Sequence, residues 1–184
     1  MIERESIELT RDVNAIVIPD GSPTSLTKGS KVTLQQSLGG TYTVSTEFGF
    51  LARIAGEDAD ALGKEVEAVQ ESDAPVDQST VDQAVWAALA TCYDPEIPVN
   101  IVELGLVYEC KVVESEARPG TFQVEVRMTL TAPGCGMGPV LQGDAATKIR
   151  NLPGVSGVNV ELVFDPPWQQ QMMSEAARLQ LGMI

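Results

Sequence analysis

The stretch TFQVEVRMTLTAPGCGMG (121–138) indicates the fold of the C-terminal half of the chain. Residues 121–130 alternate apolar with polar side chains, which is the pattern of a β-strand with one buried face. A glycine-rich loop follows over residues 131–138, and Pro139 then suits the first turn of a helix. The stretch therefore predicts a strand, a loop and a helix in that order. The apolar side chains on the strand's buried face are Phe122, Val124, Val126, Met128 and Leu130.

Further elements are predicted on both sides of this unit. A helix is expected to start at the capping-box pattern STVD (79–82). It should end at Asp94-Pro95, because the residue before a proline avoids the α conformation. Residues 104–113 and 155–164 have the apolar content of strands. The order is then α-β-β-α-β, in which the second helix can cross between strands.

The N-terminal part has a different pattern, made of short strands and turns. Residues 31–37 alternate, Gly39-Gly40 fits a two-residue hairpin loop, and residues 41–46 would form the returning strand. Residues 13–18 and 50–55 are further strand candidates. Four or five short strands in so short a segment predict a small barrel-like module.

The predicted fold class of the whole chain is α+β. A small all-β, barrel-like N-terminal module precedes a compact α-β-β-α-β domain with a mixed sheet and a C-terminal helical tail. The tail starts extended and then turns helical, and Met172, Met173, Ala176 and Leu179 are predicted to share one helical face that packs on its own domain. The module, an acidic linker, the domain and the tail are expected at residues 1–55, 56–78, 79–164 and 165–184.

Composition and charge exclude several classes of function. The chain has 184 residues, with 12 Lys and Arg against 26 Asp and Glu, a net charge of −14 and no His. Without His there is no Ser-His-Asp machine and no His-ligated zinc or haem. The acid excess, concentrated between residues 65 and 109, argues against binding to nucleic acid or to an anionic membrane. No long apolar run and no secretory signal is present, so a cytoplasmic protein is expected.

Three widely spaced cysteines fit reduced thiols better than a disulfide framework. Cys135 lies among glycines that leave its thiol unshielded, and the following helix directs its N-terminal dipole toward the sulfur. This environment favours the thiolate, which binds metals or attacks, although a small buried Cys at a tight turn is the alternative. Cys92 is expected in the core, and Cys110 inside a strand. One chain cannot supply the four thiolates of an ordinary iron–sulfur site, so a cluster would need a second copy of Cys135 or external thiols.

Asp94 and Glu96 lie in a second candidate loop, DPEIP (94–98), which two prolines make rigid. Paired carboxylates of this kind fit acid–base chemistry. The alternative is that they cap the next element and solvate the loop. The spacing alone leaves both interpretations open.

The stretches DPEIPVNIVELGLVY (94–108) and MTLTAPGCGMG (128–138) together resemble the PaaD-like iron–sulfur cluster assembly domain. Residues 27–44 and DPPW (165–168) resemble one member of that family in particular and extend the resemblance over nearly the whole chain. The resemblance implies an α/β domain, often dimeric. It also implies a non-enzymatic auxiliary factor in iron–sulfur protein maturation, which helps to assemble clusters or deliver them to apo-proteins.

The resemblance also implies a set of site residues. The family's motif cysteine falls on Cys135, its aspartate on Asp94 and its threonine on Thr131, with Glu96 and Gly134 as neighbours in the same motifs. The expected cofactor is either a transient iron–sulfur cluster with Cys135 as metal ligand, which a homodimer could share between its subunits, or none. The implied partners are iron–sulfur scaffold or carrier proteins and apo-client proteins.

Two alternatives to this function stay open. The first is a metal-free adaptor that docks client proteins through the acidic stretch or the Met-bearing C-terminal helix. The second is a Cys-dependent transferase, which would need a base other than His to activate Cys135. A carboxylate such as Asp94 is a weak base for a thiol at its ordinary pKa.

Overall fold

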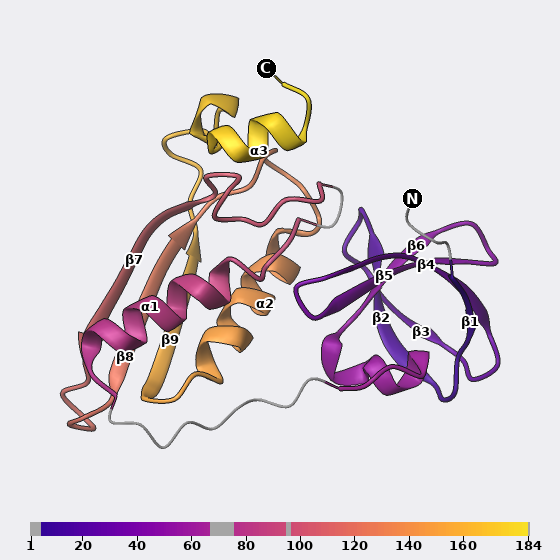
Figure 1. Ribbon diagram of the computed structural model, residues 1–184, viewed down its shortest axis with the longest axis horizontal. Coiled ribbons are helices and arrows are strands. Elements are labelled where there is room, and N and C mark those ends of the chain that lie inside the picture. The colour runs from indigo at the N-terminus through magenta and orange to yellow at the C-terminus, as the bar shows by residue number, and fades with distance from the viewer. Residues whose placement is uncertain (1–4, 67–75, 95–96, 184) are drawn as a thin grey trace. The chain divides into compact units, whose positions relative to one another are not determined.

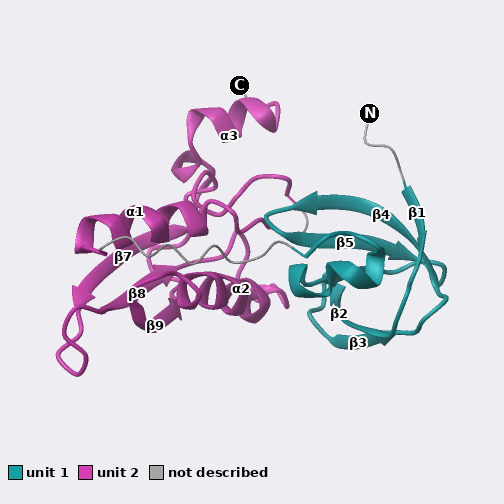
Figure 2. Ribbon diagram, turned by 60° about the horizontal axis from the view of Figure 1, so that its bottom comes forward, with its two compact units in different colours: residues 1–68 teal, residues 69–184 magenta. Residues whose placement is uncertain are grey.

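The computed structural model describes residues 5–66, 76–94 and 97–183 (Figure 1). The chain divides into two compact units, residues 1–68 and residues 69–184 (Figure 2). Each unit has its own hydrophobic core. The chain is therefore an α+β protein with two cores, and each unit is described by itself below.

The first unit is a six-stranded antiparallel sheet in the order β1-β4-β5-β6-β2-β3. No pair joins β1 to β3 among the described residues, so the sheet is open and the predicted barrel is not closed. Both edge strands are four residues long, and they carry charged residues or a proline, which discourage further pairing. The strands are β1 (Glu5–Glu8), β2 (Val13–Ile18), β3 (Pro23–Leu26), β4 (Lys31–Leu38), β5 (Thr41–Thr46) and β6 (Leu51–Ile54).

A short 3-10 helix, η1 (Gly56–Leu62), completes the first unit. Its Ala61 and Leu62 are buried in the same core as the sheet, and the Ala61 carbonyl accepts a hydrogen bond from the Thr10 N–H at 2.9 Å. The Arg11 guanidinium pairs with Asp60, whose pKa it lowers. The expected linker of residues 56–78 thus begins with a structured segment of the first unit.

The second unit has the predicted order of two helices and three strands, followed by the tail. Strand β7 runs antiparallel to β8, and β8 runs parallel to β9, so the sheet is mixed and the helix α2 is the crossover between its parallel strands. The elements are α1 (Gln78–Leu89), β7 (Val107–Glu114), β8 (Phe122–Met128), α2 (Gly138–Arg150), β9 (Val155–Leu162), η2 (Gln170–Met172) and α3 (Glu175–Gln180).

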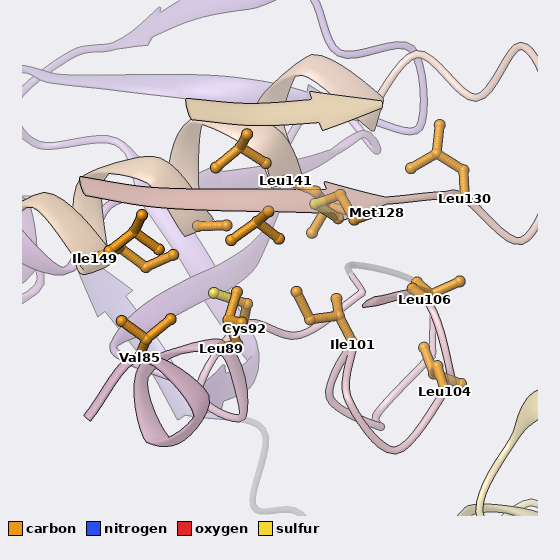
Figure 3. Packing of buried hydrophobic residues seen from close by; sticks show 14 of the residues in the cluster. Val85, Leu89, Cys92, Ile101, Leu104, Leu106, Met128, Leu130, Leu141 and Ile149 are labelled. Atoms are coloured by element: carbon orange, nitrogen blue, oxygen red, sulfur yellow. The ribbon is translucent and has the colours of Figure 1, made fainter. Parts of the chain in front are cut away.

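The alternation of β8 decides where the second core lies. Val124, Val126 and Met128 are buried, while the residues between them are exposed. Helices α1 and α2 pack on the buried face, with Leu89 and Leu141 in the same cluster (Figure 3). The other face of the sheet carries charged side chains. No helix in the described part of the chain is long and apolar enough to cross a membrane.

Helix α1 begins before the capping box predicted at residues 79–82. Asp77 is the N-cap, and its carboxylate accepts the Thr80 N–H at 2.7 Å, which lowers the pKa of Asp77. The helix ends at Leu89, so Cys92 and Asp94 follow it in the loop. Cys92 is fully buried in the second core, as predicted.

Candidate functional site

Both predicted loops lie at the carboxyl end of β8. Leu106 ends the first loop, and its carbonyl accepts the Thr129 N–H at 2.8 Å, directly after the strand. Figure 3 shows Ile101 and Leu106 beside Met128 and Leu130 at this end of the sheet, within one hydrophobic cluster. We call residues 93–106 the aspartate loop and residues 131–137 the cysteine loop.

The cysteine loop is anchored at its ends and open in its middle. Leu130 and Met137 are buried on either side, and a Cβ on Gly138 would lie 2.7 Å from Leu130 Cδ1. Between these anchors, Gly134 has a φ of +85° with no atom within 4 Å of where its Cβ would be. Its positive φ is the conformation that glycine adopts at no steric cost. The open turn therefore depends on Gly134.

Cys135 occupies an intermediate position between core and solvent. It is half-buried and packs against the edge of the second core, so it is neither the fully shielded thiol nor the fully exposed one considered from the sequence. Its N–H donates to Ala132 at a long 3.4 Å, and its carbonyl accepts the Gly138 N–H at 3.1 Å, at the start of α2. The backbone of Cys135 is therefore hydrogen-bonded to the first residue of α2.

Asp94 lies on the aspartate loop with only 7% of its surface exposed. One of its carboxylate oxygens accepts the Ile97 N–H at 3.1 Å. A β-bridge between Tyr93 and Asn100 closes the loop behind this turn, and the Ile101 N–H donates to the Cys92 carbonyl at 2.9 Å. The buried carboxylate of Asp94 thus caps a backbone N–H within its own loop.

The other predicted site residues divide between the two loops. Thr131 is half-buried, and Gly134 is exposed on the cysteine loop. Glu96 lies outside the described residues. Within residues 5–66, 76–94 and 97–183, no three Cys, Asp or Glu side chains gather closely enough to hold a metal ion.

The remaining cysteines are poorly placed to act as ligands beside Cys135. Burial, with a smaller contribution from the nearby Asp82 carboxylate, raises the pKa of the Cys110 thiol to about 11. The Cys92 thiol is fully buried and donates to the Ala88 carbonyl at 3.7 Å. A thiol must lose its proton to bind a metal, so both environments disfavour ligation.

Sequence reasoning missed the C-terminal tail as part of this region. The Trp168 indole N–H donates to the Leu104 carbonyl at 2.8 Å, and the Gln180 amide donates to the Pro98 carbonyl at 2.8 Å. Between them, Ser174 donates its N–H to the Glu103 carbonyl at 2.9 Å and its hydroxyl to the Glu103 carboxylate. The tail thus supplies hydrogen-bond donors to the aspartate loop.

The predicted face of the tail helix is wrong. Ser174 caps the helix by accepting the Ala177 N–H at 3.0 Å, so Met173 precedes the helix. Met173 and Ala177 are the buried residues, whereas Leu179 is 61% exposed. Serine is a favoured N-cap residue, so Ser174 could have located the start of this helix. A buried Trp usually donates its indole N–H to a hydrogen-bond acceptor, so Trp168 could have indicated a contact of the tail with the rest of the domain.

A groove borders the same junction on the outer side of the sheet, between β7, β8 and the tail. It has a volume of about 630 Å³, and its lining includes Tyr108, Arg127, Asp165 and Met172. The Tyr108 hydroxyl donates to the Pro166 carbonyl at 2.8 Å across it. Among the described residues, none of the site residues predicted from the sequence lines this groove.

Comparisons with known proteins agree with this picture of the second unit. A family model described as "Iron-sulfur cluster assembly protein" matches residues 82–162. The Fe-S protein maturation auxiliary factor of Porphyromonas gingivalis is 44% identical over 103 residues, which is 56% of this chain and 92% of that protein. The chain belongs to this iron–sulfur cluster assembly family.

A second related protein and a solved structure are also similar to this chain. The Fe-S protein maturation auxiliary factor SufT of Staphylococcus aureus is 39% identical over 89 residues, which is 48% of this chain and 94% of that protein. A crystal structure of a domain of unknown function from Bacillus anthracis is 33% identical with a TM-score of 0.50, covering 58% of this chain and 96% of that chain. The first unit lies outside the residues that the family model matches.

Proposed function

We propose that the protein is an auxiliary factor in iron–sulfur protein maturation, which handles a cluster as cargo through Cys135. One observation carries the proposal: a half-exposed thiol lies on an open glycine turn at the start of α2. The names of its relatives, maturation auxiliary factors, support an assisting role rather than a catalytic one. We place this role in the cytoplasm.

The coordination chemistry follows from a single thiolate per chain. An iron–sulfur cluster ordinarily takes four protein ligands, so Cys135 must share the cluster with other donors. A second copy related by a twofold axis would bring the same residue to the cluster, and a scaffold, carrier or apo-client protein would supply further thiolates. A cluster held by few ligands on one chain is suited to transfer.

The neighbouring residues would shape the place where the cluster is held. Thr131 and Gly134 lie on the cysteine loop, and the buried Asp94 sets the turn of the loop beside it. Glu96 belongs to the proposed site through its motif. The carboxylate of Asp94 would set the electrostatic environment of the cluster, and the Gly134 turn would leave room for it.

Anaerobic reconstitution with ferrous iron and sulfide tests the proposal. The wild-type chain should develop the visible absorbance of a bound cluster, and Cys135→Ser should lose most of it. Cys110→Ser is the matched control, because that thiol is half-buried within β7 and should leave the absorbance unchanged. Equal reconstitution of Cys135→Ser and the wild type would overturn the ligand role.

The oligomeric state of the loaded protein tests the shared cluster. If two copies of Cys135 hold one cluster, the loaded protein should sediment as a dimer with one cluster per two chains. Removing the cluster with a chelator should then return the protein toward its unloaded state. A loaded monomer with added small thiols would instead assign the missing ligands to external donors.

A metal-free adaptor is the second candidate, and the exposed ring of Phe48 in the first unit favours it. Phe48 is 80% exposed in the turn between β5 and β6, and its ring stacks on the half-buried Phe50 with centroids 6.5 Å apart. An exposed aromatic ring that continues into other apolar surface is a candidate protein interaction site. Capture of an apo-client protein without iron, retained by Cys135→Ser but lost in Phe48→Ser, would favour the adaptor.

A further inference from the structure

The aspartate loop combines irregular backbone with a buried position. Val99, Ile101 and Leu104 are all in the second core, although the loop contains neither a helix nor a strand of the sheet. Buried backbone carbonyls outside regular structure need hydrogen-bond partners, because an unpaired polar group in the interior is unfavourable. Some of these partners lie within the loop, as where the Leu104 N–H donates to the Asn100 carbonyl at 3.0 Å, and the sheet binds the Leu106 carbonyl through the Thr129 N–H. Other carbonyls of the loop are bound by the tail.

The C-terminal tail supplies the partners in a regular progression. Trp168 binds the carbonyl of Leu104, the Ser174 N–H binds that of Glu103, and Gln180 binds that of Pro98. As the tail advances, its contacts therefore move back along the aspartate loop toward Asp94. The tail is therefore hydrogen-bonded to the loop at three positions between Pro98 and Leu104.

The tail and the aspartate loop approach each other closely at Gly105, where a side chain would not fit. A Cβ at this position would lie 2.1 Å from the Met172 carbonyl oxygen, and the φ of Gly105 is +69°. Only glycine meets both conditions. Met173 and Ala177 then enter the core beside the loop, so the tail is bound by packing as well as by hydrogen bonds.

The last contact reaches the turn that holds the carboxylate. Gln180 fixes the Pro98 carbonyl, and the residue before it, Ile97, donates its N–H to Asp94. We propose that Gln180 and Trp168 are positioning residues of the cluster site, which hold the Asp94 turn beside the cysteine loop. This inference rests on the proposed function and assigns it a second structural element, the C-terminal tail.

Two substitutions each remove one hydrogen-bond donor of the tail. Gln180→Glu keeps the shape of the side chain and loses the donor, and Trp168→Phe keeps an aromatic ring and loses the indole N–H. Gln180→Lys restores a donor to the Pro98 carbonyl and is the conservative rescue. Gln171→Glu is the matched control, because it makes the same change of charge at an exposed position of the same tail.

The readout is the rate at which a chelator removes the reconstituted cluster, measured together with thermal unfolding of each variant. Gln180→Glu and Trp168→Phe should each lose the cluster about fivefold faster than wild type, the factor expected for one hydrogen bond. Gln180→Lys should return toward the wild-type rate, and Gln171→Glu should match it. A merely structural role would change the unfolding temperature without changing the chelation rate.

The outcomes separate this inference from the proposed function. If the wild-type absorbance depends on Cys135 but Gln180→Glu and Trp168→Phe lose the cluster no faster than Gln171→Glu, the positioning role is overturned and the proposed function stands. If wild type and Cys135→Ser reconstitute equally, the proposed function fails and the positioning role fails with it. Faster loss in both variants, with rescue by Gln180→Lys, supports the inference.

Discussion

The aspartate loop and the cysteine loop lie at the same end of β8 but are held in place very differently. Three carbonyls of the aspartate loop are bound by the tail, and its Val99, Ile101 and Leu104 side chains lie in the core. The cysteine loop is fixed at Leu130 and Met137, with an exposed middle and a long 3.4 Å bond at Cys135. The difference indicates that the aspartate loop is fixed by a distant segment of the chain, whereas the cysteine loop is fixed mainly at its own two ends.

Substitution of one glycine in each loop should give the largest difference in stability between the loops. Both glycines have a positive φ, but only Gly105 has other atoms close to where a Cβ would lie. Gly105→Ala should destabilise the second unit by about 4 kcal/mol, from backbone strain and from collision with the Met172 carbonyl. Gly134→Ala meets no atom and should cost about 1 kcal/mol from strain alone. Denaturant unfolding measures both, and equal losses would show that the two loops are equally constrained.

The tail's packing gives the next largest effect. Met173 is 5% exposed in the second core, so Met173→Ala should cost about 3 kcal/mol by leaving a cavity next to the aspartate loop. Leu179→Ala, on the exposed side of α3 in the same tail, should change stability by less than about 0.5 kcal/mol. Denaturant midpoints compare the two. A near-neutral Met173→Ala would mean that the tail does not hold the loop in solution.

Thiol modification compares the cysteine loop with the core around it. At pH 8, iodoacetamide should label Cys135 about tenfold or more faster than Cys110, whose raised pKa of about 11 keeps the thiol protonated. Labelling of Cys110 should increase as pH rises toward that value, and the buried Cys92 should react only on unfolding. Mass spectrometry of timed samples gives the three rates. Slow labelling of Cys135 would place its sulfur within the core.

Local patterns predicted the second unit well, because its elements carry their own periodicity. The alternation of residues 121–130 located β8, and Pro139 located the start of α2. The glycines and prolines identified both loops. The prediction of the first unit was less complete. The short edge strands β1 and β3 and the helix η1 have little apolar periodicity, so their positions depend on contacts with other parts of the unit.

The contacts of the candidate site could not be predicted in the same way. The bonds from Trp168 and Gln180 end on backbone carbonyls far away in the sequence, and such bonds leave no pattern in either segment. The same holds for Asp94, whose burial depends on the closure of its loop. Helical periodicity misplaced the tail's buried face because the cap at Ser174 decides where the helix begins.

Two substitutions of Asp94 separate its proposed roles in loop structure and in cluster binding. Asp94→Asn keeps an oxygen that can accept the Ile97 N–H, so the unfolding free energy should change by less than about 1 kcal/mol. Asp94→Ala removes the acceptor and should cost about 2 kcal/mol. If the negative charge also serves the cluster, Asp94→Asn should lower the reconstituted absorbance while remaining folded. If Asp94→Asn instead binds as much cluster as wild type, the negative charge of Asp94 is not needed for cluster binding. The role of Asp94 would then be to accept the Ile97 N–H and so fix the conformation of the aspartate loop.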